Sequence, residues 1–189
     1  MNLHTGMFED GTAYKTIGNL NRFIADSEPY AWHCWDKVKL VCLDVDGVLT
    51  DGAMYWTPEG RIFKKFHTRD VTAVKRLQQA GIKVAAITSA DCPITRSRLL
   101  DMKVDYTWEI CEDKWRAIQE IAGELCEMDT ETVAFAGDDD MDREALSKVG
   151  SAFVPKDGLN GLPGYRCVTK GGEGVLSEIA ELILKARNG

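Results

Sequence analysis

The chain has little that would attach it to a membrane, to a nucleic acid or to the exported, disulfide-bonded class. It contains no run of about 18 or more apolar residues, the length that a bilayer-spanning helix needs, and no apolar stretch typical of a signal peptide near its beginning. Its formal net charge of -7 disfavours a nucleic acid or an anionic membrane, because those partners bind clustered Lys and Arg. We therefore expect a soluble, cytoplasmic protein with no nucleic-acid and no membrane partner.

The 6 cysteines form no Cys-x-x-Cys pair, which disfavours a zinc site or a dithiol redox centre. An even number of cysteines could form disulfides, but a chain of 189 residues can bury a full-sized core and does not need them. We expect reduced, mostly buried thiols, which fits the cytoplasm. The length suits one domain, and the sequence contains no internal repeat and no low-complexity segment.

Residues 1–36 lack sustained apolar periodicity, so we expect an irregular N-terminal extension there, followed by a single domain over residues 37–189. A cluster near the end of this extension, residues 31–35, contains Trp32, His33, Cys34 and Trp35. His33 and Cys34 are adjacent, and neither has a second ligand at a useful spacing for a metal. The favoured interpretation is that the two tryptophans anchor the extension on the domain or on a neighbouring subunit.

From Val38 onward, short apolar runs rich in β-branched residues alternate with segments of helical periodicity. This alternation predicts an α/β fold, a Rossmann-like parallel sheet with helices on both faces and ligands at the carboxyl ends of the strands. Residues 53–66 read as a small β-hairpin inserted after the first strand. The expected strands are residues 38–43, 83–87, 104–107, 132–136 and 152–154, and the expected helices are residues 70–79, 93–100, 113–126, 142–149 and 174–186.

Polar residues follow the ends of successive expected strands. Because these ends meet at one edge of a parallel sheet, we expect their side chains to line a single crevice. The residues are Asp44 and Asp46 after the first strand, Thr88 and Ser89 after the second, Lys114 at the start of the helix after the third, and Asp138, Asp139, Asp140 and Asp142 after the fourth.

Several carboxylates in one crevice repel one another and need a cation, and hard oxygen ligands without nearby His or Cys point to Mg²⁺. A carboxylate beside a metal-bound phosphate can attack phosphorus, and a second carboxylate two residues on can exchange the protons. A hydroxyl, backbone N–H groups and a lysine can then neutralise the developing charge. Taken alone, Asp44-Val45-Asp46-Gly47 could also be turn residues with no catalytic role.

The order Asp-x-Asp-Gly-Val-x-Thr, a strand-end Thr, Lys and then Gly-Asp-Asp-x-x-Asp resembles the haloacid dehalogenase-like hydrolase superfamily. The intervals from Asp46 to Thr88 and from Lys114 to Asp138 leave no room for the cap domain that many members insert. The capless group containing 3-deoxy-D-manno-octulosonate 8-phosphate (KDO 8-phosphate) phosphatase is the most similar. It matches residues 49–52 (Leu-Thr-Asp-Gly), 66–70 (Phe-x-x-Arg-Asp), 137–139 (Gly-Asp-Asp), 148–150 (Lys-Val-Gly) and 171–174 (Gly-Gly-Glu-Gly), as well as the hairpin.

This resemblance implies a role for each matching residue and a homotetramer, in which a neighbour's hairpin and C-terminal tail roof the active site. The implied nucleophile is Asp44 and the implied acid/base Asp46. The implied magnesium ligands are the carboxylates of Asp44 and Asp138 and the carbonyl of Asp46. The implied phosphate-binding residues are Thr88, Ser89 and Lys114, with Asp139, Asp142 and Arg69 in supporting positions.

The chain departs from the family pattern beside the expected substrate pocket. Ser89-Ala90 stand where the family usually has Gly-Arg, and Ser177 stands where it often has Arg. The expected substrate is a small phosphorylated sugar, KDO 8-phosphate or a related 2-keto-3-deoxy sugar acid phosphate. Two alternatives stay open: the same chemistry on a macromolecular or nucleotide phosphate, and a non-catalytic assembly domain that kept the fold.

Overall fold

The computed structural model describes residues 3–7, 13–17, 23–25, 35–126 and 129–188, and the chain divides into two compact units, Met1–Tyr30 and Ala31–Gly189. In the first unit, three short strands pair antiparallel in the order β1-β2-β3. The sequence predicts an irregular segment here, whereas the structure has three strands. Strands this short show no sustained periodicity, so the sequence does not reveal them. The strands are β1 (Leu3–Met7), β2 (Ala13–Ile17) and β3 (Phe23–Ala25).

The second unit is built on a six-stranded sheet in the order β11-β10-β9-β4-β7-β8, and every neighbouring pair in it is parallel. The predicted α/β fold is confirmed. The central strand β4 is flanked by β7 and β9, so the carboxyl ends of these three strands lie next to one another. The strands are β4 (Leu40–Asp44), β7 (Lys83–Ile87), β8 (Tyr106–Trp108), β9 (Val133–Ala136), β10 (Ser151–Val154) and β11 (Tyr165–Arg166).

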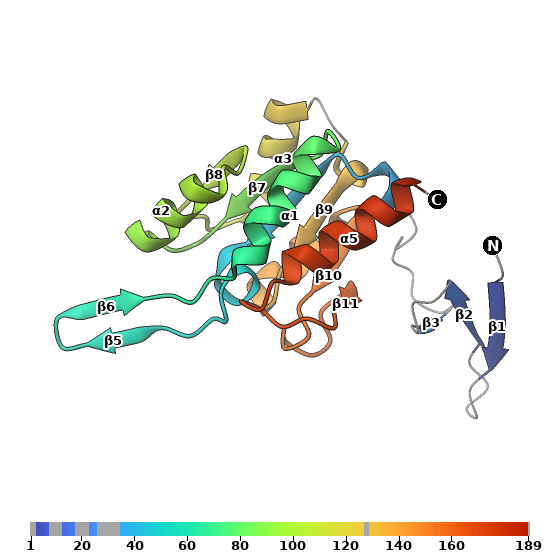
Figure 1. Ribbon diagram of the computed structural model, residues 1–189, viewed down its shortest axis with the longest axis horizontal. Coiled ribbons are helices and arrows are strands. Elements are labelled where there is room, and N and C mark those ends of the chain that lie inside the picture. Colours follow the sequence, from blue (N-terminus) through green and yellow to red (C-terminus); the bar gives the residue numbers. More distant parts are fainter. Residues whose placement is uncertain (1–2, 8–12, 18–22, 26–34, 127–128, 189) are drawn as a thin grey trace. The chain divides into compact units, whose positions relative to one another are not determined.

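Helices cover both faces of this sheet (Figure 1). Alternate strand residues point to opposite faces, so Val41 and Leu43 pack in the cluster with α1, α2 and α5, whereas Leu40 and Cys42 pack in the cluster with α3 and α4. The strand residues are apolar on both sides, as expected for a parallel sheet buried between helices. The helices are α1 (Thr68–Gln79), α2 (Pro93–Met102), α3 (Lys114–Cys126), α4 (Arg143–Lys148) and α5 (Val175–Asn188).

The hairpin predicted after the first strand is confirmed. Strands β5 (Tyr55–Thr57) and β6 (Gly60–Phe63) pair antiparallel and project from the body of the second unit (Figure 1). An isolated bridge between Thr50 and Phe66 closes the base of this hairpin. The hairpin exposes apolar side chains, including Trp56 at 65% and Phe63 at 56% of their full accessible areas.

Trp35 begins a single helical turn, Trp35–Lys37, and its ring packs against Phe153 and Tyr165 at centroid distances of 5.4 and 5.2 Å. One of the two predicted tryptophan anchors therefore packs on the core of the second unit. Trp32, His33 and Cys34 lie outside the described residues.

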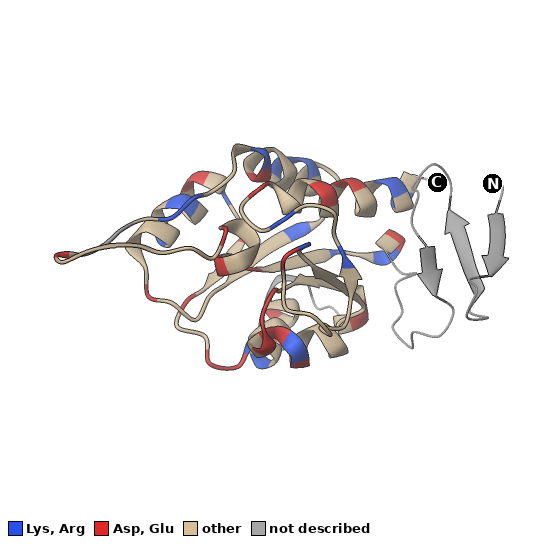
Figure 2. Ribbon diagram, turned by 90° about the horizontal axis from the view of Figure 1, so that it is seen from below, with Lys and Arg blue, Asp and Glu red and all other residues tan. Residues whose placement is uncertain are grey.

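The described cysteine side chains, Cys42, Cys92, Cys111 and Cys167, are buried thiols outside any disulfide, as predicted. Acidic and basic residues lie side by side on the helices, as in the pairs Arg116–Glu120 and Lys185–Glu181 (Figure 2). Within the described part of the chain, no helix combines the length and apolar character that crossing a bilayer requires.

Candidate active site

The site begins where β4 ends. All five residues of β4 are buried, and Asp44, its last residue, keeps only 7% of its surface exposed. The chain then turns sharply over Val45–Leu49, and the N–H of Thr50 donates to the carbonyl of Val45 at 3.0 Å. Gly47 permits this turn, because its φ of 90° is unfavourable for other residues and a Cβ there would lie 2.0 Å from Oδ2 of Asp138. The turn thereby brings the backbone after Asp44 against the Asp138 carboxylate.

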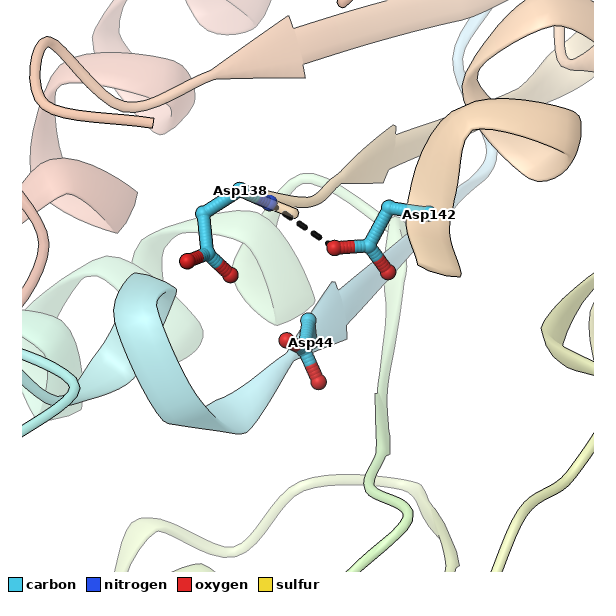
Figure 3. A group of neighbouring side chains, drawn as sticks. All are labelled: Asp44, Asp138 and Asp142. Carbon is cyan, nitrogen blue, oxygen red and sulfur yellow. Dashed lines mark hydrogen bonds between the residues drawn. The ribbon is translucent and has the colours of Figure 1, made fainter. Parts of the chain in front are cut away.

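The loop after β9 is organised by Asp142, which is fully buried. Its Oδ2 accepts the N–H groups of Asp138 at 2.8 Å and Asp139 at 3.1 Å, and the first of these bonds is drawn in Figure 3. Asp139 in turn accepts the N–H of Asp140 through its side chain. These contacts fix the loop so that the carboxylate of Asp138 points toward Asp44 (Figure 3).

Lys114, the first residue of α3, joins the two loops. Its ammonium lies 3.0 Å from Oδ1 of Asp44 and 2.6 Å from Oδ1 of Asp142, and only 7% of the residue is exposed. Burial lowers the pKa of Lys114, but the two neighbouring carboxylates outweigh this effect and raise it above the usual value. Lys114 is therefore a fixed positive charge beside Asp44.

One buried ammonium does not neutralise three carboxylates. Burial, together with the charges of Asp142 and Asp138, raises the pKa of Asp44 to about 8 even though Lys114 opposes the shift. Burial and Asp142 raise the pKa of Asp138 to about 6. Without a further cation, the protein therefore disfavours the ionised forms of Asp44 and Asp138. A bound cation would offset this repulsion and stabilise both carboxylates.

Donor chemistry and geometry agree with that condition. Carboxylate oxygens of Asp44, Asp138 and Asp142 lie within 4.8 Å of one another. Both oxygens of Asp142 already accept hydrogen bonds, one from Lys114 and the other from the loop backbone. Oδ1 of Asp138 is buried and accepts no hydrogen bond from the described residues. The group fits a hard divalent cation, which Asp44 and Asp138 would bind while Asp142 positions the loop that carries Asp138.

The structure brings the predicted residues together unevenly. Asp44, Asp138, Asp142 and Lys114 form one connected group. Thr88 is buried at the end of β7, where its hydroxyl accepts the N–H of Ala90 at 3.2 Å and its backbone bonds to the loop before α3.

Three predicted residues lie on the surface. Ser89 and Asp139 are exposed. Arg69 is exposed at the start of α1 and forms no ion pair with another described residue, so it does not join the group of carboxylates.

Sequence reasoning missed Lys64. This buried lysine follows β6, and its ammonium lies 2.7 and 2.6 Å from the two carboxylate oxygens of Asp46. Lys64 and Lys65 are adjacent lysines at the end of the predicted hairpin, and no pattern distinguishes the buried one from the exposed one.

No protein-family model matches the chain. A curated relative from Haemophilus influenzae, named 3-deoxy-D-manno-octulosonate 8-phosphate phosphatase, is 32% identical over 155 residues, which cover 80% of this chain and 86% of the relative. The chain belongs to the KDO 8-phosphate phosphatase family. The resemblance predicted from the sequence is thereby confirmed, and membership makes the chain a phosphoric monoester hydrolase.

Solved structures of this phosphatase family have the same fold. The KDO 8-phosphate phosphatase of Yersinia pestis superposes with a TM-score of 0.82 at 29% identity, covering 94% of this chain and 95% of the other. The Moraxella catarrhalis phosphatase, solved with a magnesium ion, a phosphate ion and KDO, gives a TM-score of 0.79 at 28% identity, covering 84% of this chain and 92% of the other.

Proposed function

We propose that the chain is a Mg²⁺-dependent phosphatase of a small phosphorylated sugar acid, KDO 8-phosphate or a related 2-keto-3-deoxy sugar acid phosphate. One observation carries the proposal. Asp44 is buried at the end of β4, held 3.0 Å from the Lys114 ammonium, and faces Asp138, whose Oδ1 accepts no hydrogen bond from the described residues. The names of the relatives support the choice of substrate.

In the first half-reaction, Oδ of Asp44 attacks phosphorus while the bond from phosphorus to the sugar oxygen breaks. The departing oxygen takes a proton from the carboxyl group of Asp46, and Asp44 becomes an aspartyl-phosphate. Lys114 stays protonated throughout, so its charge is available to the phosphoryl oxygens as negative charge redistributes over them.

In the second half-reaction, Asp46 acts as a base. It accepts a proton from a water molecule as that water attacks phosphorus, and the bond between phosphorus and Asp44 breaks. Inorganic phosphate leaves, Asp44 is again a carboxylate and Asp46 is again protonated. The two carboxyl groups thus have different roles in different environments. Asp44, which is buried, is the nucleophile, and Asp46, which is partly exposed, transfers the protons.

The carboxylates of Asp44 and Asp138 and the carbonyl of Asp46 would hold Mg²⁺, which supplies charge neutralisation between the protein carboxylates and the phosphate. Thr88 and Lys114 would bind phosphoryl oxygens, and the backbone after Thr88 would add N–H donors there. We assign Ser89 to this group as well, through its position after Thr88. Asp142 and Asp139 support the metal loop, and Arg69 stays a candidate contact to the rest of the substrate.

The catalytic domain proposed here spans residues 37–189, with residues 1–36 as an extension. We further propose a cytoplasmic homotetramer. The four described buried cysteines form no disulfide, which suits a reducing compartment, and the hairpin offers exposed apolar side chains such as Trp56 and Phe63 to a neighbour. Light scattering of the purified protein at several concentrations tests the tetramer, and a monomeric mass would overturn it.

A panel of phosphate esters, assayed with and without Mg²⁺, tests the function. The proposal predicts Mg²⁺-dependent phosphate release with the highest kcat/KM on a 2-keto-3-deoxy sugar acid phosphate. A higher kcat/KM on a phosphopeptide or a nucleotide would overturn the substrate class. This comparison matters because the chain departs from the family pattern at Ser89-Ala90 and at Ser177. Failure to hydrolyse any ester would favour the non-catalytic assembly domain.

A further inference from the structure

Lys64 is a buried cation that the mechanism above does not use. Its side chain has no exposed surface, so it cannot reach a substrate that enters from solvent. The ammonium lies 2.7 Å from Oδ1 and 2.6 Å from Oδ2 of Asp46, and 3.2 Å from the hydroxyl of Thr95. The three N–H bonds of Lys64 therefore have three acceptors, two on Asp46 and one on Thr95.

The two oxygens of Asp46 are not equivalent. Among the described residues, Oδ1 accepts both from Lys64 and from the hydroxyl of Thr50, the latter at 3.1 Å, whereas Oδ2 accepts from Lys64 alone. The side chain of Asp46 is 31% exposed, whereas the side chain of Lys64 has no exposed surface. A carboxylate oxygen offers about two acceptor positions, which leaves a free one on Oδ2.

This contact joins three separate segments of the chain. Asp46 is in the turn after β4, Lys64 follows the hairpin strand β6, and Thr95 is in the first turn of α2. A buried ammonium is strongly unfavourable without an anion. Separating the hairpin base from the turn after β4 would leave Lys64 buried without its carboxylate, so this charge pair holds the two segments together. The orientation of Asp46 is thereby fixed in part by residues outside its own turn.

We propose that Lys64 is a positioning residue that fixes the Asp46 carboxyl group for proton transfer at Oδ2, and that Thr95 positions Lys64. This inference rests on the proposed function. The proton passes from Oδ2 to the departing oxygen as the phosphorus–oxygen bond breaks, and Lys64 keeps all of its own protons. A displacement of the Asp46 carboxyl group by about 1 Å would lower the rate of such a transfer on the order of 100-fold.

The test is a comparison of two esters in the variant Lys64→Met, which keeps the buried volume and removes the donors. For both esters, kcat/KM reports the steps up to formation of the aspartyl-phosphate, where the leaving group departs. The alkoxide leaving from KDO 8-phosphate needs a proton, whereas p-nitrophenolate leaves without one. We expect kcat/KM to fall by roughly 100-fold on KDO 8-phosphate and by less than about threefold on p-nitrophenyl phosphate.

Three further variants complete the design. Lys65→Met removes a neighbouring lysine whose side chain is 50% exposed, and it should leave both kcat/KM values unchanged. Thr95→Val should shift the ratio of the two kcat/KM values in the same direction as Lys64→Met but less, and Thr95→Ser, which restores the hydroxyl, should return the wild-type ratio. If Lys64→Met does not fold, as judged by its thermal melting curve, the two Thr95 variants decide.

The outcomes separate the two proposals. Equal losses on both esters would mean that Lys64 supports the fold of the site as a whole, and would overturn the positioning role while leaving the proposed phosphatase function in place. A wild-type ratio in both Lys64→Met and Thr95→Val would overturn it as well. If the wild-type protein hydrolyses neither of these esters nor any other ester of the panel, the proposed function fails, and the inference about Lys64 fails with it.

Discussion

The ammonium of Lys114 lies 3.0 Å from a carboxylate oxygen of Asp44, and the same ammonium lies 2.6 Å from Asp142. One buried cation thus holds the residue at the end of β4 against the residue that organises the loop after β9.

Replacing Lys114 by Met should destabilise the metal-free protein by about 3 kcal/mol at neutral pH, because the fully buried Asp142 then loses its cation. Chemical denaturation of the two proteins measures the change in the free energy of unfolding. Lys83→Met is the matched control, since Lys83 pairs with Asp105 at 2.8 Å but its side chain is 47% exposed. That control should cost less than about 1 kcal/mol. Similar losses of stability in both variants would contradict the prediction that the buried Lys114 stabilises the fold more than an exposed lysine does.

The metal-free protein should lose stability as the pH rises from about 4 to 8. The folded state keeps a proton on Asp44, whose pKa is raised from 3.8 to about 8, while the unfolded state releases it at lower pH. Stability therefore falls across that interval and levels off above it. Thermal melting between pH 4.5 and 8.5 measures the slope. Asp44→Asn should flatten it, and added Mg²⁺ should raise the melting temperature most at the alkaline end. A slope unchanged in Asp44→Asn would contradict the prediction.

Gly47→Ala should disrupt the site without a charge change. The new Cβ would lie 2.0 Å from Oδ2 of Asp138, and the φ of 90° adds backbone strain. We expect loss of phosphatase activity and weaker stabilisation by Mg²⁺ in the melting assay. Gly81→Ala also stands at positive φ, 76°, but its Cβ would meet no neighbouring atom within 4 Å, so it should lose some stability and keep its activity. Equal activities in the two variants would contradict the close approach of the Gly47 backbone to the Asp138 carboxylate.

Ile110→Gly should raise stability by on the order of 1 kcal/mol. Ile110 holds a φ of 55°, which a β-branched residue adopts only with strain, and its side chain is 64% exposed, so little burial is lost. The greater freedom of glycine in the unfolded chain offsets part of this gain. A lower melting temperature in Ile110→Gly than in the wild type would contradict the estimate of strain.

Much of the second unit is predictable from the sequence, because its elements follow strong local patterns. The strand over Lys83–Ile87 has the predicted bounds, and the helix α3 begins one residue after its predicted start, at Lys114. The order of Asp44, Thr88, Lys114 and Asp138 along a parallel sheet is enough to predict that they converge. The spacing of the carboxylates after β9 predicts their place, but not that Asp142 is buried as a support while Asp138 faces Asp44.

The rest depends on contacts between distant segments that no local pattern reveals. Strand β11, only Tyr165–Arg166, is too short to show periodicity and exists through its pairing with β10. The pairing of Lys64 with Asp46 bridges 18 positions, and only the path of the hairpin decides that Lys64 rather than Lys65 turns inward. Arg69 was predicted from a motif to support the site, but it is exposed and makes no ion pair with the described residues, and its role stays a prediction.

The central claim is that Asp44 carries the phosphoryl group during turnover. The most direct measurement mixes the enzyme with Mg²⁺ and KDO 8-phosphate or p-nitrophenyl phosphate, quenches in acid within a turnover and maps the covalently phosphorylated peptide by mass spectrometry. The account predicts one phosphoryl group on Asp44 in the wild type and none in Asp44→Asn, which should also release no phosphate. A phosphoryl group on another residue, or Mg²⁺-dependent turnover retained in Asp44→Asn, would contradict it.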